Sequence, residues 1–129
     1  MILVLDTTVL IDHLRGRPVA GRIEAMAQGG DVLATTGINV EEVIRGLRPS
    51  ERKAARALIE GLVILPIGRD EGILAGTWRR EFAGRGVTLS QADCLVATAA
   101  VTSGARLATG NPRDFPMKGL DVEHWPVGG

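Results

Sequence analysis

Four acidic residues along the chain have the chemistry of a hydrolytic centre. Asp6 directly follows the apolar run 2–5. The other three lie in or near later element junctions: Glu42, Asp93 and Asp114. Continuous apolar runs are typical of parallel strands covered on both faces, and ligands of such sheets bind beyond the carboxyl ends of the strands. An acid at the end of the first strand therefore marks the expected site.

Two of these acids also have a structural explanation. Asp6 could cap the helix that follows it, but Thr7 and Thr8 could serve equally well, so we favour a functional role for Asp6. Ser90-x-x-Asp93 matches a capping box, and an acid in the first turn suits the helix dipole. Capping and function explain Asp93 equally well when it is considered alone.

The remaining acids are ambiguous for other reasons. Glu41 and Glu42 point about 100° apart on a helix, so they cannot face one site equally, and the nearby apolar residues do not choose between them. Asn111 and Asp114 follow the last buried strand in a segment rich in turn residues. Turn formation explains either of these two residues when it is considered alone.

Taken together, the acids indicate a divalent-cation site. Carboxylates gathered at one sheet edge without lysine partners would repel one another in the absence of a cation. Oxygen-only ligands favour Mg²⁺ or Mn²⁺, whereas Cys94, His13 and His124 lack the spacing of zinc ligands. The expected chemistry is attack of a metal-activated water on a phosphodiester. A phosphoryl-transfer domain with Asp6 as nucleophile is disfavoured, because no second acid follows two residues later.

Composition sets broader limits. The 129 residues predict one domain, 1–129, which buries about two-thirds of its unfolded surface. One cysteine, no signal sequence and no membrane-length apolar stretch predict a cytoplasmic protein without membrane contact. Fifteen basic and fifteen acidic residues exclude a dominant basic field. Arg45 and Arg48 belong to a local basic group that could contact RNA, although solvated helix faces are the ordinary explanation of such groups.

Apolar periodicity supplies the elements that must position the acids. Buried strands are expected at 2–5, 32–34, 62–65 and 106–108, with a short edge strand near Val122 and Trp125. Helices are expected between them, at 7–15, 18–29, 36–47, 50–61, 70–83 and 90–102. Ser50 is expected to cap one of these helices, and Asp12 to face solvent. This alternation predicts a three-layer α/β fold with a mostly parallel central sheet.

Four motifs, in this order, resemble the PIN-domain ribonucleases, and in particular the VapC toxins of bacterial toxin–antitoxin pairs. The segments are 4–11 (VLDTTVLI), 40–46 (VEEVIRG), 93–100 (DCLVATAA) and 107–115 (LATGNPRDF). The resemblance covers essentially the whole chain. It implies a PIN-like fold and a Mg²⁺- or Mn²⁺-dependent endoribonuclease, with RNA as substrate. It also implies a homodimer inhibited by a cognate VapB-like antitoxin.

The resemblance also implies roles for individual residues. Asp6 and Asp93 match two family acids, and Glu42 is selected over Glu41 because the family glutamate precedes a small residue, here Gly46, by four positions. The fourth position falls on either Asn111 or Asp114, with Thr109 and Thr7 as neighbouring hydroxyls. Two alternatives remain: a catalytically silent PIN-like binding or assembly module, and a housekeeping RNA-processing PIN nuclease.

Overall fold

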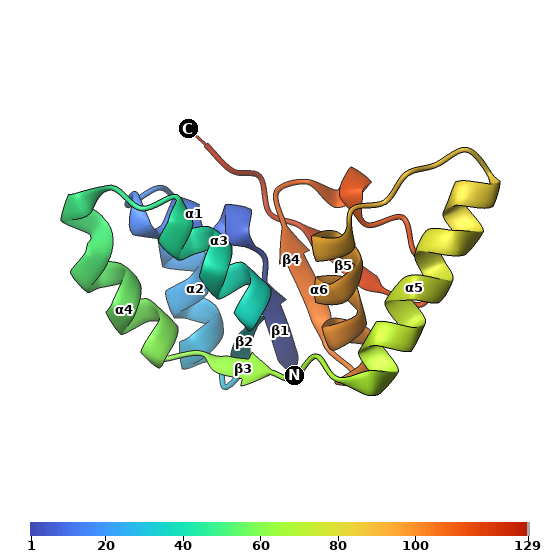
Figure 1. Cartoon of the computed structure of the whole chain (residues 1–129). Helices are drawn as coiled ribbons and strands as arrows, with labels where there is room; N and C mark the ends of the chain where they lie inside the picture. The colour runs from blue at the N-terminus through green and yellow to red at the C-terminus, as the bar shows by residue number, and fades with distance from the viewer. Residues whose placement is uncertain (129) are drawn as a thin grey trace.

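The computed structural model describes residues 1–128 and is built around a five-stranded, wholly parallel sheet with helices on both faces (Figure 1). The strand order is β3-β2-β1-β4-β5. The strands are β1 (Ile2–Leu5), β2 (Val32–Thr36), β3 (Val63–Leu65), β4 (Arg106–Thr109) and β5 (Asp121–His124). The α/β prediction is therefore confirmed, and the sheet is parallel throughout.

Six α-helices and two short 3₁₀ turns connect the strands in residues 1–128. The helices are α1 (Thr7–Leu14), α2 (Val19–Gln28), α3 (Gly37–Arg45), α4 (Arg52–Glu60), α5 (Arg69–Gly84) and α6 (Gln91–Thr102). The turns are η1 (Pro49–Glu51) and η2 (Pro112–Asp114). In Figure 1, α5 and α6 lie on one side of the sheet and α1 to α4 on the other. None of the described helices is long and apolar enough to cross a membrane.

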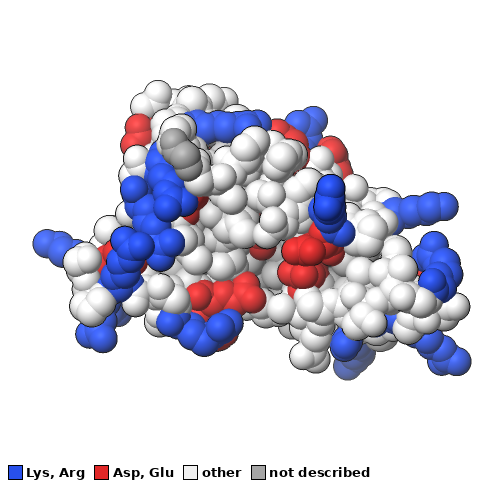
Figure 2. Space-filling view, turned by 90° about the horizontal axis from the view of Figure 1, so that it is seen from above, with Lys and Arg blue, Asp and Glu red and all other residues white. Residues whose placement is uncertain are grey.

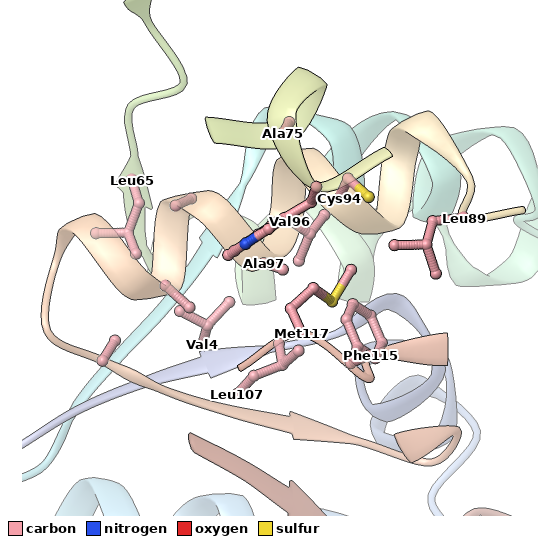
Figure 3. Packing of buried hydrophobic residues seen from close by; sticks show 14 of the residues in the cluster. Val4, Leu65, Ala75, Leu89, Cys94, Val96, Ala97, Leu107, Phe115 and Met117 are labelled. Carbon is pink, nitrogen blue, oxygen red and sulfur yellow. The ribbon is translucent and has the colours of Figure 1, made fainter. Parts of the chain in front are cut away.

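Alternation along the strands divides the core into two clusters. Successive side chains of a strand point to opposite faces, so Val4 enters one cluster while Leu3 and Leu5 enter the other. The first cluster joins the sheet to α5 and α6, and Figure 3 shows Met117 and Phe115 packed near its centre. The second cluster joins the sheet to α1, α2, α3 and α4. Burial on both faces explains why the β1 sequence is a continuous apolar run.

The register of the sheet brings the carboxyl ends of the strands to one edge. Leu5 pairs with Ala108 across β1 and β4, and the Asp6 N–H extends this pairing to the Ala108 carbonyl at 3.0 Å. On the outer side of β4, Thr109 pairs with His124. Residues that follow these strands are therefore brought together at this edge, whatever their distance in sequence.

Three sequence expectations are wrong. The third strand is not buried, because β3 is an edge strand and Val63 and Ile64 are 49% and 47% exposed. Ser50 does not cap a helix: it lies inside η1, where Glu51 Oε1 accepts the Arg48 N–H at 2.8 Å. Asp12 is only 3% exposed.

The Asp12 side chain lies between α1 and the C-terminal segment 125–128, and its contacts with that segment bury it. Its carboxylate accepts the Gly128 N–H at 3.0 and 3.2 Å and pairs with Arg17 at 2.9 Å. Trp125, at the start of that segment, is 1% exposed and packs its ring against the Arg22 guanidinium at 4.0 Å. The expected edge strand near Val122 is confirmed as β5, and the residues after it return across α1.

Candidate active site

All of the sequence-predicted acids line one hollow at the carboxyl edge of the sheet. The hollow has a volume of about 310 Å³. Its lining is Asp6, Thr7, Thr8, Glu42, Arg45, Asp93, Asn111 and Asp114. Figure 2, which views the molecule from above, shows acidic side chains gathered near the middle of this face with basic side chains around them. The first strand, two helices and the loop after β4 thus supply carboxylates to one place.

Asp6 occupies the N-cap position of α1, yet its side chain makes no capping hydrogen bond. Its two carboxylate oxygens accept other donors: Asn39 Nδ2 at 3.2 Å and Thr109 Oγ1 at 2.7 Å. Burial raises the pKa of Asp6 above its ordinary value, and the nearby Glu42 charge acts in the same direction. The hydrogen bonds from Thr109, the Thr7 backbone and Asn39 oppose this rise. The absence of a capping bond agrees with the preference for function over capping at Asp6.

Glu41 and Glu42 have different surroundings on α3. Glu42 lies in the hollow and accepts the Thr7 hydroxyl at 2.6 Å. Glu41 is exposed and forms an ion pair with Arg45 at 3.0 Å, one helical turn away. The geometry therefore brings Glu42, and not Glu41, into the cluster of acids.

Asn39 is part of the site's framework, and sequence reasoning missed it. It is fully buried, its amide also donates to Thr7 Oγ1 at 3.0 Å, and its Oδ1 accepts the Thr36 hydroxyl at 2.8 Å. Thr36 also caps α3 by accepting the Asn39 N–H at 3.4 Å, a role that threonine commonly has at the start of a helix. One signal was available: Asn39 precedes Glu42 by three residues and so shares its side of the helix.

Asp93 lies in the first turn of α6, where the structure shows one half of the capping box that the sequence suggests. Ser90 Oγ accepts the Asp93 N–H at 3.0 Å, which confirms Ser90 as the cap. The Asp93 side chain nevertheless lines the acidic hollow and is half-buried. Burial is the main cause that raises the pKa of Asp93, and the charges of Asp114, Asp6 and Glu42 add to it. The first turn of α6 is thus both capped and open to the site.

The loop after β4 brings both candidates for the fourth position to the hollow. Asn111 and Asp114 are exposed lining residues, so the choice between them stays open. Thr109 is fully buried beneath them, where its hydroxyl donates to Asp6 and accepts the Asn111 N–H at 3.0 Å. Thr109 therefore links the position of Asp6 to that of the loop.

The two arginines named as candidate RNA contacts differ in position. Arg45 lines the acidic hollow, although its guanidinium is engaged by Glu41. Arg48 is exposed at the start of η1 and does not line this hollow. A direct contact of Arg48 with a group held at the acids therefore lacks support from the geometry.

The donor atoms fit a hard divalent cation. They are carboxylate, amide and hydroxyl oxygens, which Mg²⁺ and Mn²⁺ prefer. Within residues 1–128, none of the four acids has an ion-pair partner within 4.0 Å. In the same part of the chain, no group of three or more His, Cys, Asp or Glu side chains is arranged so that it could hold a metal ion by itself. Mg²⁺ commonly keeps several waters and is held by one or two carboxylates together with substrate phosphates.

Comparison with known proteins gives a consistent family. The PIN domain model matches residues 3–118. Ribonuclease VapC19 of Mycobacterium tuberculosis is 31% identical over 115 residues, which is 88% of this chain and 92% of that protein. Ribonuclease VapC10 of the same organism is 32% identical over 117 residues, or 91% and 87% of the two chains.

Solved structures agree on the fold. VapBC2 from Rickettsia felis, solved bound to a DNA fragment from its promoter, superimposes with a TM-score of 0.85 at 22% identity, covering 97% of this chain and 99% of that one. DNA-bound VapBC from Salmonella typhimurium gives 0.82 at 24% identity, covering 97% and 98%. Together with the match over residues 3–118, these findings confirm the resemblance: the chain belongs to the PIN-domain family, among relatives named VapC ribonucleases.

Proposed function

We propose that the chain is a Mg²⁺- or Mn²⁺-dependent endoribonuclease, the toxin of a toxin–antitoxin pair. One observation carries the proposal: four carboxylates from distant segments converge on one hollow, and within residues 1–128 none of them forms an ion pair within 4.0 Å. The names of the curated relatives supply the ribonuclease class. A structural role alone does not account for this convergence, because uncompensated carboxylates at one edge destabilise the fold.

In this proposal Asp6, Glu42, Asp93 and Asp114 hold the cation, with Asn111 as an additional oxygen donor. A bound cation lowers the pKa of water and offsets charge on the leaving oxygen. The protein's contribution is to fix the carboxylates before substrate arrives. Asn39 and Thr109 hold the two oxygens of Asp6, and the Thr7 hydroxyl holds one oxygen of Glu42. Such partners fix the orientation of ligands and so influence metal affinity.

The proposed VapB-like antitoxin would cover a groove beside the acids. The groove lies between α3 and α4, has a volume of about 720 Å³ and includes the apolar side chains of Val40, Ile44, Leu47 and Ile59. Arg45 lines both this groove and the acidic hollow, so a protein in the groove would lie next to the acids. A basic side chain of that protein could then pair with the carboxylates.

The antitoxin and homodimer proposals have separate tests. Ile44 is 51% exposed, so Ile44→Asp should weaken binding of a VapB-like antitoxin without unfolding the chain. The proposed homodimer should show twice the 13.6 kDa chain mass in light scattering of the isolated protein. A monomer mass at working concentration contradicts the dimer and leaves the nuclease proposal intact.

Cleavage of RNA by purified protein tests the main proposal. Wild type should cleave RNA in Mg²⁺ or Mn²⁺ and stop in EDTA, while Asp6→Asn and Asp93→Asn should lose cleavage by orders of magnitude. Glu41→Gln is the matched control, because it neutralises an acid of α3, next to Glu42 in sequence, that lies outside the hollow. Equal cleavage in EDTA, or unchanged cleavage by the two Asp variants, contradicts a metal-dependent nuclease.

A further inference from the structure

A second hollow adjoins the acidic hollow at the carboxyl edge of the sheet. Its volume is about 490 Å³. Its lining is Gly110, Asn111, Pro112, Arg113, Asp114 and His124. Asn111 and Asp114 line both hollows, so the two are neighbours on this edge of the sheet. A polymer with one phosphodiester at the acids can therefore place its neighbouring unit in the second hollow.

The chemistry of the second hollow differs from that of the first. Its wall carries an arginine and a histidine, both exposed, and only one carboxylate. In the described part of the chain, Arg113 has no ion-pair partner within 4.0 Å. A free guanidinium binds phosphate through paired hydrogen bonds. Flat guanidinium and imidazole groups also stack on the unpaired bases of single-stranded RNA.

The floor of this second hollow is fixed by contacts from two directions. The Gly110 N–H donates to Thr8 Oγ1 at 3.0 Å, which ties the loop to α1. A Cβ atom at Gly110 would lie 2.7 and 2.8 Å from the two Cγ atoms of Val127, so the C-terminal segment packs directly on the glycine backbone. The Trp125 N–H also donates to the Thr109 carbonyl at 2.8 Å. Arg113 and His124 therefore project from a loop and a strand end that are held in fixed positions.

We propose that the second hollow is a nucleotide subsite, in which Arg113 binds a backbone phosphate and His124 stacks on the base next to the cleaved bond. This subsite rests on the proposed nuclease function and deepens it, because it names single-stranded RNA as the ligand. It also assigns a binding role to His124, a residue placed by the register of β5 against β4 and absent from the acid motifs.

Binding of RNA tests the subsite separately from cleavage. The probe is a short fluorescein-labelled RNA of random sequence, and the background is Asp93→Asn, so that binding is measured without cleavage. Arg113→Ala should weaken binding about tenfold. The slope of log K against log salt concentration should become less steep by about 0.7, which is the contribution of one phosphate contact in a single strand. Arg69→Ala is the matched control, because Arg69 is an exposed arginine at the first residue of α5 and lines neither hollow.

Substitution at His124 tests the stacking part. His124→Ala should weaken binding about tenfold, whereas His124→Phe, which keeps a flat ring, should stay within about twofold of His124. In the cleavage-competent chain, Arg113→Ala and His124→Ala should raise KM more than they lower kcat. Their affinity for Mn²⁺ alone should equal that of wild type, because neither residue lines the acidic hollow.

The outcomes separate the two proposals. A wild-type chain that cleaves no RNA in Mn²⁺ refutes the nuclease proposal. A different outcome refutes only the subsite: the wild-type chain cleaves RNA, but Arg113→Ala and His124→Ala leave RNA binding, KM and salt dependence unchanged. Variants that keep RNA binding but lose the protein partner assign the second hollow to the antitoxin, and this result also overturns the subsite.

Discussion

Removing the buried amide of Asn39 should weaken both the fold and its affinity for a divalent cation. Asn39→Leu keeps a side chain of similar size but deletes the donors to Asp6 and Thr7 and the acceptor for Thr36. A neutral hydrogen bond contributes about 1 kcal/mol and one to a charged group about 1.5–3 kcal/mol, so unfolding free energy should fall by roughly 3–5 kcal/mol. Because the partners of metal ligands set their orientation, Mn²⁺ affinity should fall about 10–100-fold.

Two measurements separate the effects of this substitution. Urea unfolding in EDTA reports stability, and calorimetric titration with Mn²⁺ reports affinity in the folded protein. Thr98→Val is the control: it removes a buried hydroxyl that donates to the Leu95 carbonyl on α6, and should cost about 1 kcal/mol with no change in Mn²⁺ affinity.

Asn39→Asp keeps an acceptor for Thr36 but places a carboxyl oxygen beside Asp6, so the folded state of this variant should become less stable as pH rises. A folded Asn39→Leu protein with wild-type Mn²⁺ affinity would refute the reasoning.

Three further predictions concern the site and the C-terminal segment that packs near it. The raised pKa of Asp6 means that the folded, cation-free protein binds protons more tightly than the unfolded chain, so its stability should fall as pH rises from the ordinary carboxyl pKa through the raised value. Asp6→Asn should therefore raise Tm in EDTA at neutral pH and make stability depend less on pH. A lower Tm would contradict the inference that the ionised Asp6 carboxylate destabilises the cation-free protein. Gly110→Ala should cost about 1–3 kcal/mol by overpacking against Val127, and Val127→Ala should recover most of that loss in a double-mutant cycle of urea unfolding. Asp12→Asn should lower stability by about 1–2 kcal/mol and speed hydrogen exchange at the Gly128 amide, whereas unchanged exchange would show that Asp12 does not anchor the C-terminal segment.

Local signals were sufficient to predict most of the framework. The apolar run before Asp6 identified the central strand, and Thr36 and Ser90 cap their helices as their types suggest. Those signals depend on neighbours in sequence, so they can be recognised from the sequence alone. The order of acids at strand and helix ends also predicted that Asp6, Glu42, Asp93 and the later loop would meet, because parallel strands share one carboxyl edge.

Long-range contacts account for what could not be predicted. The position of β3 at the edge of the sheet follows from strand order, and its apolar sequence looks the same as that of a buried strand. Asp12 looked like a surface acid because its partner, the Gly128 N–H, is 116 residues away. Asn39 carries no motif of its own and gains its importance from Asp6, 33 residues earlier. Polar side chains satisfied by distant partners leave no local pattern.

The hydrogen bond between Thr109 and Asp6 joins residues 103 positions apart, at the carboxyl ends of the neighbouring strands β4 and β1. During synthesis, the strand that carries Asp6 emerges early, but its neighbour β4 emerges only after most of the chain is complete. Pairing of such distant strands is slow, because the entropy cost of closing the intervening chain arises before the stabilising contacts between the strands form. In a toxin this order places assembly of the site after synthesis of most of the chain, since a chain that ends before β4 has Asp6, Glu42 and Asp93 but neither Asp114 nor the sheet edge that gathers them.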